Sequence, residues 1–372
     1  MTLADLMKTA GYATGLFGKW HLGALDPRYH PNSRGFDEFA GFRGGWSDYW
    51  QWRLDRNRTF AKADGRYLTD VITEEAVGFI DRHRAEPFFL HVTYNAPHFP
   101  FQVPDEELEP FADLDVTQGV RTIYAMNRRM DKGVGRILET LDRHCLAENT
   151  LVIFTSDNGP QFGGDGETDT TRYNACFNGC KGLVYEGGIR VPAVLRWPVG
   201  LAAGACVGEM VHFTDWLPTL ASVAGVRIPD DCELDGRDAL PVIRGEAASI
   251  VGPRFWQWNR YSPVGTCNAA MRDGQWKLIR PLFPEPMRLT REDLDMDRRL
   301  KYEGESITDI CRDPEPPRVI PDPPPAQLYD LGSDPYEQRD LAVERPEILS
   351  RMQAALDEWF GSVERDRLSI KD

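Results

Sequence analysis

The sequence contains no run of apolar residues long enough to span a bilayer. It also has no excess of positive charge, because 58 acidic side chains outnumber 43 basic ones and leave a formal net charge of −15. These two absences argue against a membrane span, against non-specific binding of nucleic acid and against attachment to an anionic membrane surface. A small anionic substrate remains possible, because a few local cations can hold it.

Paired cysteines are absent as well. The seven cysteines are scattered, and neither a Cys-x-x-Cys pair nor a Cys/His zinc spacing occurs. Cys176 and Cys180 are close in sequence, but ordinary reduced thiols explain them better than a redox or catalytic pair. The N-terminus lacks the basic-then-apolar layout of a signal peptide, and the compartment stays open.

A core of good size is available, since 41% of the 372 residues are hydrophobic. Helical and strand patterns alternate over residues 1–248, which predicts an α/β domain with a large, mostly parallel mixed sheet flanked by helices. Residues 249–372 predict a smaller α+β subdomain with a small antiparallel sheet and a terminal helix. The predicted strands are Tyr12–Phe17, Pro87–Thr93, Leu151–Thr155, Val191–Trp197, Arg254–Arg260 and Trp276–Arg280, and the predicted helices are Thr2–Ala10, Asp70–His83, Gly119–Leu141, Val211–Ala224 and Pro346–Trp359.

The stretch Leu151–Pro160 combines four apolar residues with a polar turn. It predicts a buried strand of the α/β sheet that ends where Asp157 and Asn158 emerge. Ligands bind at the carboxyl ends of strands in open α/β sheets, and a carboxylate next to an amide oxygen suits Ca²⁺ or Mg²⁺. Asp-Asn-Gly is also ordinary turn chemistry, which leaves a plain turn as the alternative.

Three further segments carry polar side chains at or near strand ends. The first gives Lys19 and His21, the second gives His98, and the third gives Lys181 just before Glu186. If these ends share one sheet edge, two lysines and two histidines surround a cation site, which suits an anionic tetrahedral group. Each residue also has an ordinary structural explanation, because a lone lysine is usually solvated and a histidine beside Pro or Trp is often packed.

The segment from Asp26 to Trp52 is rich in glycine and aromatic residues and is expected to be mostly loop. Its overlap with the Arg- and aromatic-rich stretch Arg43–Arg58 suggests one wall of a substrate pocket. A satellite core beneath a long loop explains the same composition, and the pattern does not decide between the two.

The motifs now resemble those of a known family. GKWHLG, NAPHFPF, TSDNGP and KGLVYEGGIRVP occur in this order in sulfatases of the arylsulfatase type, within the alkaline-phosphatase superfamily. Looser stretches agree, among them HPNSRGFDEFAGFRGG, TDWLPTLASVAGV, MRDGQWKLI and LYDLGSDPYEQRDLA. The resemblance covers almost the whole chain, and the motifs are specific only when taken together.

The resemblance implies roles for the residues already singled out. Lys19 and His21 would contact the sulfate and the nucleophile, and His98 would protonate the leaving group. Asp157 and Asn158 would ligate a divalent cation, usually Ca²⁺ in this family. Lys181 would bind a sulfate oxygen. The substrate would be a sulfate ester of a small molecule or a glycan.

The chain departs from the family pattern in one respect. Members begin with a strand that carries an Asp-Asp pair of further metal ligands, followed by a Cys/Ser-x-Pro-x-Arg motif whose first residue becomes formylglycine, the nucleophile. Both lie before the segment that corresponds to Thr2 of this chain, and neither that strand nor the motif occurs here. We therefore expect a sulfatase-type chain that lacks its N-terminal part, binds a hard cation weakly and is inactive as it stands. Loss of a central strand is also expected to leave exposed strand edges.

Two alternatives stay open at this point. The same superfamily site handles tetrahedral phosphorus, so a phosphatase or phosphonate monoester hydrolase is one. A non-catalytic binder of sulfated glycans that has lost its nucleophile is the other. The sequence names neither the natural ester nor the oligomeric state.

Overall fold

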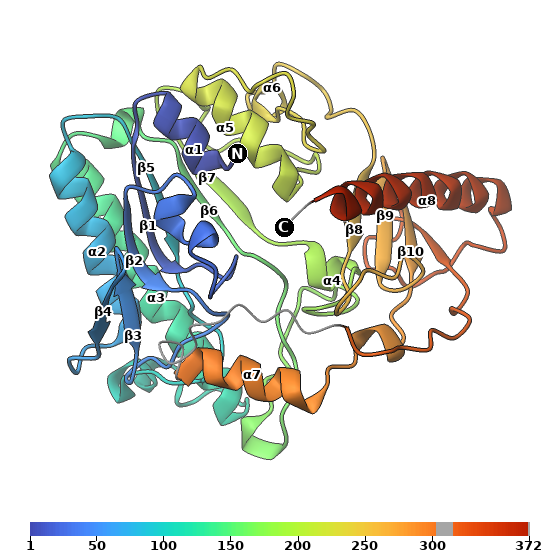
Figure 1. Cartoon of the computed structure of the whole chain (residues 1–372), viewed down its shortest axis with the longest axis horizontal. Helices are drawn as coiled ribbons and strands as arrows, with labels where there is room; N and C mark the ends of the chain where they lie inside the picture. The colour runs from blue at the N-terminus through green and yellow to red at the C-terminus, as the bar shows by residue number, and fades with distance from the viewer. Residues whose placement is uncertain (303–314, 371–372) are drawn as a thin grey trace.

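A computed structural model describes residues 1–302 and 315–370 of the chain. It shows an α/β unit built on a five-stranded sheet and a C-terminal unit with a four-stranded antiparallel sheet (Figure 1). The predicted combination of a mixed sheet flanked by helices with a smaller antiparallel sheet is confirmed. No helix within these described residues is long and apolar enough to cross a membrane.

The larger sheet has the strand order β4-β3-β2-β1-β5. Strand β1 pairs in parallel with β2 and with the edge strand β5, whereas the β2–β3 and β3–β4 pairings are antiparallel. Parallel pairing is therefore confined to the β2-β1-β5 side of the sheet and is less dominant than predicted. The strands are β1 (Ala13–Lys19), β2 (Glu38–Phe42), β3 (Arg53–Arg56), β4 (Thr59–Lys62) and β5 (Phe88–Thr93).

Both faces of strand β1 are covered by helices. Leu16 and Phe17 point to opposite faces and are each 1% exposed. Phe17 packs with α2 and α3 on one side, and Leu16 packs against α1 on the other. A capping box formed by Thr2 and Asp5 starts α1. These helices are α1 (Leu3–Thr9), α2 (Leu68–His83) and α3 (Gln118–Arg143).

Strand β2 lies inside the segment that the sequence predicted as loop, so that prediction was wrong for Glu38–Phe42. Its glycine is required by packing rather than by a turn: a Cβ on Gly41 would lie 1.8 Å from the carbonyl oxygen of Gly18 on β1. The glycine that lets the two backbones approach also weakens the strand pattern in the sequence.

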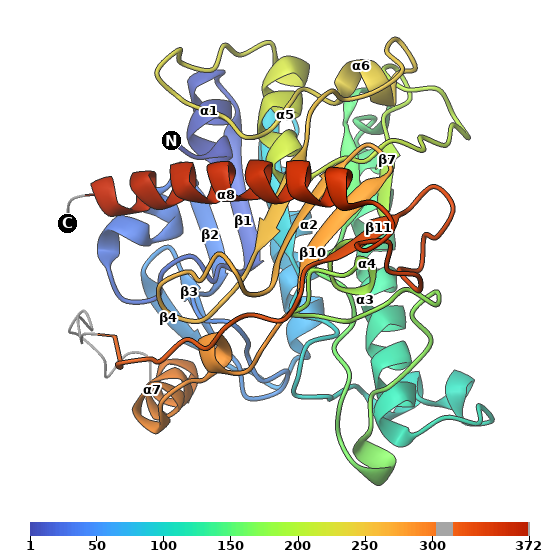
Figure 2. The same cartoon turned by 90° about the vertical axis from the view of Figure 1, so that its right-hand side faces the viewer.

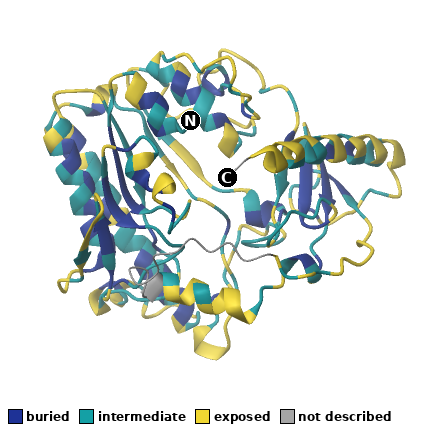
Figure 3. Ribbon diagram, viewed as in Figure 1, coloured by how far each residue is buried: buried dark blue, intermediate teal, exposed yellow. Residues whose placement is uncertain are grey.

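The predicted central strand Leu151–Thr155 forms β6 (Val152–Thr155), but it is not buried within the larger sheet. It pairs only with β7 (Ala193–Arg196), in antiparallel orientation, within the described residues. Phe154 on β6 is 39% exposed and Val194 on β7 is 60% exposed, and Figure 3 shows exposed residues along this pair. The prediction of a buried strand was wrong here, because no neighbouring strand in the described residues covers these apolar side chains.

The C-terminal sheet has the order β11-β10-β9-β8, and all its pairings are antiparallel. The terminal helix α8 lies across one face (Figure 2), where it contributes Met352 and Leu356 to a core. The other face packs against Val184 and Tyr185, which precede α4. The elements are α4 (Glu186–Ile189), α5 (Trp216–Ala224), α6 (Leu240–Ile243), α7 (Arg291–Tyr302), α8 (Pro346–Ser369), β8 (Arg254–Gln257), β9 (Ala269–Asp273), β10 (Trp276–Arg280) and β11 (Gln327–Asp330).

Candidate active site

The carboxyl end of β1 presents Lys19, which is half-buried, and then His21, which is exposed. Gly18 fixes this end of the strand: its φ is +121°, and a Cβ there would lie 2.1 Å from the carbonyl oxygen of Thr93 on β5. The Thr93 hydroxyl donates a hydrogen bond of 2.7 Å to the Lys19 carbonyl. The His21 N–H donates to the Arg43 carbonyl at 3.2 Å, so both neighbouring strands hold the segment in place.

The segment after β5 carries His98. Its N–H donates to the Asn95 carbonyl at 2.7 Å, and its own carbonyl accepts a 3.0 Å hydrogen bond from the buried Tyr49 hydroxyl. Trp46 packs edge-to-face on Phe99, with ring centroids 5.7 Å apart. The aromatic loop between β2 and β3 therefore packs against the His98 segment and helps to fix its position.

The protonation state of His98 follows from its contacts. Its Nδ1 lies 2.8 Å from the Phe99 carbonyl, which can only accept, so Nδ1 carries the proton and Nε2 is left for a substrate. Burial lowers the pKa of the imidazole below its ordinary value. The bond to Phe99 raises the pKa, the charges of Lys181 and Lys19 lower it further, and Asp157 raises it. The balance keeps the ring neutral at pH 7.

Asp157 and Asn158 lie in the loop after β6, and this loop is tied to α4. The Gly159 N–H donates to the Gly188 carbonyl at 2.8 Å, and a Cβ on Gly159 would lie 1.9 Å from the carbonyl oxygen of Gly187. The Asn158 side-chain amide donates to the Gly159 carbonyl at 2.8 Å, which leaves its oxygen as the ligand atom. The loop thus offers one carboxylate and one amide oxygen.

Lys181 joins this loop through its backbone, because its N–H donates to the Pro160 carbonyl at 2.8 Å. The influence of Lys19, Lys181 and Asp157 on the pKa of His98 places these four side chains in one electrostatic environment. Segments that are far apart in sequence therefore come within electrostatic range of one another. The roles assigned to them individually remain predictions.

His21 and Asn158 complete the predicted set. The His21 ring lies against the backbone of the next loop, where a Cβ on Gly45 would be 2.8 Å from its Nε2. Asn158 is adjacent to Asp157 in the same turn. The two residues thus lie close in sequence to members of the cluster, His21 two positions after Lys19 and Asn158 directly after Asp157.

The described residues fit a hard cation in ligand type but not in number. Asp157 and Asn158 supply two oxygens, whereas Ca²⁺ takes six to eight and Mg²⁺ takes six. Within residues 1–302 and 315–370, no group of three or more His, Cys, Asp or Glu side chains could hold a metal.

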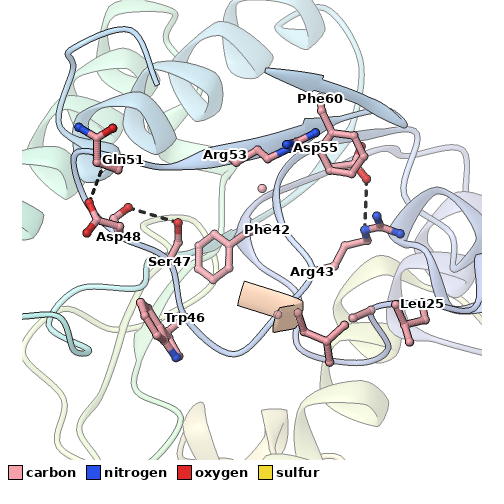
Figure 4. A pocket seen from close by; sticks show the side chains of 14 residues that line it. Leu25, Phe42, Arg43, Trp46, Ser47, Asp48, Gln51, Arg53, Asp55 and Phe60 are labelled. Atoms are coloured by element: carbon pink, nitrogen blue, oxygen red, sulfur yellow. Dashed lines mark hydrogen bonds and ion pairs between the residues drawn. The ribbon is translucent and has the colours of Figure 1, made fainter. Parts of the chain in front are cut away.

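A pocket of about 120 Å³ lies beside the site (Figure 4). Two arginines flank the ring of Phe60 there, with guanidinium carbons 5.5 Å (Arg43) and 4.7 Å (Arg53) from the centroid. Arg43 also pairs with Asp55, 3.4 Å away, and Asp55 is buried. Trp46, which contacts Phe99, lines the same pocket. Its wall is thus continuous with the strand ends that carry His21 and His98.

Both readings of the Arg43–Arg58 stretch hold. Tyr49, Trp52 and Leu54 are at most 2% exposed and belong to the main core, whereas Arg43 and Trp46 line the pocket. Sequence reasoning missed the hydrogen bond between His30 and Asp55, which are 3.0 Å apart. Asp55 lines the pocket, and this contact helps to fix its side chain. The two residues are 25 apart in sequence, and only the buried acid in β3 hinted at a partner.

Sequence reasoning also missed a buried ionic cluster of Lys277, Glu186 and Glu337, with Lys277 at 0% exposure. A lysine between Trp276 and Leu278 in an otherwise apolar strand was the available signal, since such a residue is buried only with a partner. Its partners come from segments too distant in sequence to be paired by pattern.

The structure thus brings Lys19 and His98, which end or follow strands of the larger sheet, into electrostatic range of Asp157 and Lys181, which lie between β6 and β7. Residues 1–226 match the family model described as Sulfatase. Residues 177–297 match the one described as N-sulphoglucosamine sulphohydrolase, C-terminal. The first match covers more than half of the chain, which therefore belongs to the sulfatase family, in the alkaline-phosphatase superfamily.

Curated relatives agree with this assignment. Arylsulfatase J of Mus musculus is 27% identical over 415 residues, which cover 100% of this chain and 64% of that protein. N-acetylgalactosamine-6-sulfatase of Homo sapiens is 33% identical over 298 residues, which cover 69% of this chain and 54% of that protein. The chain spans about half to two thirds of the length of the curated relatives it matches.

Solved structures show the same likeness. Ps i-CgsB superposes with a TM-score of 0.77 at 27% identity, over 96% of this chain and 73% of that chain. Its complex with k-i-k-neocarrahexaose gives a TM-score of 0.76. BT4656 in complex with its substrate D-glucosamine-2-N,6-O-disulfate gives a TM-score of 0.68 at 18% identity, over 98% of this chain and 82% of that chain, which is a likeness of fold alone.

Proposed function

We propose that the protein is a sulfuric ester hydrolase of the arylsulfatase type and that it holds the sulfate group between Lys19 and Lys181. The match of residues 1–226 to the Sulfatase family model carries the proposal, and the charges of both lysines, which lower the pKa of His98, support the placement of the sulfate. Two fixed ammonium groups neutralise the charge on sulfate oxygens, and they do so more strongly in a half-buried site than in water.

His98 faces the ester with Nε2. Its Nδ1–H is engaged by the Phe99 carbonyl, which fixes both the ring orientation and the tautomer. Because burial and the two lysines lower its pKa, the neutral ring must gain a proton before it can donate one to the leaving oxygen. His98 is therefore expected to be neutral when the ester binds and to become protonated only during the reaction, before it donates to the leaving oxygen.

The alcohol part of the ester would occupy the pocket beside the site. Phe60, Trp46 and the two arginines offer flat apolar surfaces and hydrogen-bond donors, a combination that suits a sugar ring. A sulfated glycan is accordingly the proposed substrate class. Relatives of similar fold are described with such ligands, and this supports the class without fixing the sugar.

Asp157 and Asn158 would contribute two ligands to Ca²⁺ or Mg²⁺. A bound cation would supply further positive charge next to the sulfate. Since two ligands bind a hard cation weakly, we expect millimolar affinity at best for this chain by itself. The family's nucleophile motif does not occur in its 372 residues, so we expect these residues by themselves to bind sulfate without turnover.

Calorimetric titration of the chain with inorganic sulfate, and separately with phosphate, tests the proposal. We expect saturable sulfate binding that weakens when Lys19 or Lys181 is replaced by methionine. Equal or tighter binding of phosphate would favour the phosphate- or phosphonate-hydrolysing alternative instead. Turnover of p-nitrophenyl sulfate would contradict the expected inactivity, and absence of any sulfate binding would contradict the proposed function itself.

A further inference from the structure

A buried ionic triad links α4 to the C-terminal sheet. The ammonium group of Lys277, on β10, lies 2.8 Å from a carboxylate oxygen of Glu186 and 2.7 Å from one of Glu337. None of the three side chains is more than 3% exposed. The second Glu337 oxygen accepts a 2.8 Å hydrogen bond from the backbone N–H of Glu186. Three charges are therefore held away from water at the first residue of α4.

Stability alone explains such an arrangement poorly. Removing charges from water costs about as much as their attraction returns, and apolar replacements of buried ionic groups are often neutral or stabilising. Burial raises the pKa of the Glu337 carboxyl even though Lys277 counteracts it, which reflects this cost. What buried ionic groups can provide is a single defined position, because a shifted partner leaves a charge unpaired.

The position that the triad defines is transmitted to the site in two short steps. The turn that starts with Glu186 presents the Gly188 carbonyl, which accepts the Gly159 N–H of the Asp157–Asn158 loop. Pro160, the next residue of that loop, accepts the N–H of Lys181. Each link is a backbone hydrogen bond of 2.8 Å, and the Gly159–Gly187 approach leaves no room for slippage.

A second contact from the same sheet supports the lysine loop. The side chain of Asn268, which is 1% exposed, donates to the Gly182 carbonyl at 2.8 Å and accepts from the Val184 N–H at 3.3 Å. The loop from Lys181 to Glu186 is thus fixed at both ends by polar groups of the C-terminal unit. Strand β6 by itself cannot fix it, because β6 has only β7 as a partner in the described residues.

We propose that Lys277, Glu186 and Glu337 are positioning residues that hold Lys181 and the Asp157–Asn158 loop in register with Lys19 and His98. The proposal rests on the proposed function in one point only, namely that Lys181 binds sulfate. If the three residues act in this way, the C-terminal sheet positions one half of the anion site, and the larger sheet carries the other half.

The test compares three variants of the full chain. Glu337→Ala removes the acceptor of the Glu186 N–H while leaving the Lys277–Glu186 pair, and it is expected to raise the dissociation constant for inorganic sulfate at least fivefold. Glu337→Gln keeps an acceptor for the Glu186 N–H but turns an amide N–H group toward the Lys277 ammonium, so its loss of sulfate affinity should be smaller than that of Glu337→Ala without being absent. Asp215→Ala is the matched control, since Asp215 is an equally buried acid that pairs with Arg254 of the same sheet at 2.9 Å, away from the site.

Amide hydrogen exchange gives a second readout that does not depend on sulfate. In Glu337→Ala the amides of Gly159 and Lys181 should exchange faster, while those of β1 should not change. The unmodified chain offers a further check should this variant fail to fold: Gly159, Lys181 and Glu186 should open together, with one shared dependence on denaturant.

Unchanged sulfate affinity and unchanged exchange in folded Glu337→Ala would overturn the proposal, and so would equal losses in Glu337→Ala and Asp215→Ala. Independent opening of Gly159 and Glu186 in the unmodified chain would also overturn it. If the unmodified chain does not bind sulfate, the proposed function fails, whereas the exchange results still decide whether the triad holds the loop.

Discussion

The two halves of the candidate site are held by different forces. The half with Lys19 and His98 sits on a sheet whose central residues, Leu16 and Phe17, are 1% exposed on both faces. The half with Asp157 and Lys181 lies in the connection between the two strands of a ribbon, β6 and β7, whose Phe154 is 39% exposed. The ribbon packs on an apolar cluster at Val152, and the connection beyond it is held by backbone hydrogen bonds to a turn fixed by buried charges.

This difference has consequences for how each half responds to change. Apolar packing is non-directional and tolerates small shifts in charge, whereas a buried ionic anchor depends on complete pairing. Damage to the sheet half should therefore reduce the stability of the whole chain. Damage to the loop half should reduce anion binding first and stability less.

The largest effect is expected from Gly18→Ala. The new Cβ would meet the Thr93 carbonyl oxygen at 2.1 Å in a left-handed backbone conformation, so β1 and β5 must separate. We expect a loss of about 3 kcal/mol in the free energy of unfolding, measured by urea denaturation. Gly11→Ala is the control: φ is +80° with nothing within 4 Å, so only backbone strain of about 1 kcal/mol applies. Similar losses in both variants would contradict the packing argument.

Gly159→Ala should have its main effect on binding. Its Cβ would lie 1.9 Å from the Gly187 carbonyl oxygen, which pushes the Asp157–Asn158 loop off α4. We expect roughly tenfold weaker sulfate binding by calorimetry, with a loss of about 1–2 kcal/mol in unfolding free energy. Gly208→Ala meets open space and should change neither quantity. A loss of stability as large as that of Gly18→Ala would erase the distinction between the two halves.

The same distinction explains what the sequence could predict. The helix–strand pattern located β1 and β5, and these two strands are parallel neighbours, so Lys19 and His98 come at the same edge of the sheet, as the strand-end rule expects. Asp157 follows β6, which lies outside that sheet. The strand-end rule assumed that all these strands share one sheet edge, and this assumption applies to β1 and β5 but not to β6. An apolar run such as Val152–Thr155 indicates a strand but does not identify its partners.

Interactions between distant residues were out of reach. Lys277 lies 91 positions after Glu186, and Glu337 lies 151 positions after it. No periodic pattern in the sequence connects residues so far apart. Strand β2 was missed because Gly41, which close packing requires, is a residue that strands usually avoid. Local patterns thus predict elements, while the tertiary pairing that positions the loop half has no local signature.

Replacing one lysine from each half compares them directly. Lys19→Met and Lys181→Met should each weaken sulfate binding about tenfold, because a charge-assisted hydrogen bond is lost. Lys181→Met should also raise the pKa of His98, which Lys181 lowers. Calorimetry and NMR titration of the imidazole provide the two measurements, and Lys62→Met, on the exposed strand β4, is the control. An effect confined to one lysine would mean that the anion does not bridge the halves.

His98 should make sulfate binding depend on pH. Its pKa is lowered, so the ring is neutral at pH 7 and gains a positive charge only as the pH falls through that lowered pKa. We expect sulfate affinity to rise severalfold from about pH 7 to about pH 5, which spans the ordinary histidine value. In His98→Gln the affinity should stay flat over the same range. A rise that persists in this variant would assign the effect to another group.

The smallest effect concerns His83, through which the stability of the sheet half depends on pH independently of sulfate binding at the site. Burial lowers the pKa of His83, but hydrogen bonds to Glu38 and Glu86 outweigh it, and the pKa is raised. Because the folded pKa exceeds the unfolded one, this stabilisation is complete below the unfolded value, about 6.5, and is lost as the pH rises through the folded pKa.

His83→Gln should therefore reduce the unfolding free energy by about 0.5 kcal/mol at pH 6 and by less at pH 9. Arg82→Gln removes a partner of Glu38 that does not titrate in this range, and its cost should be the same at both values. Sulfate affinity should be unchanged in both variants, since Glu38 begins β2 at the edge of the sheet opposite the site. Altered affinity in His83→Gln would show that the two edges are coupled through the sheet, and the separation into independently held halves would then fail.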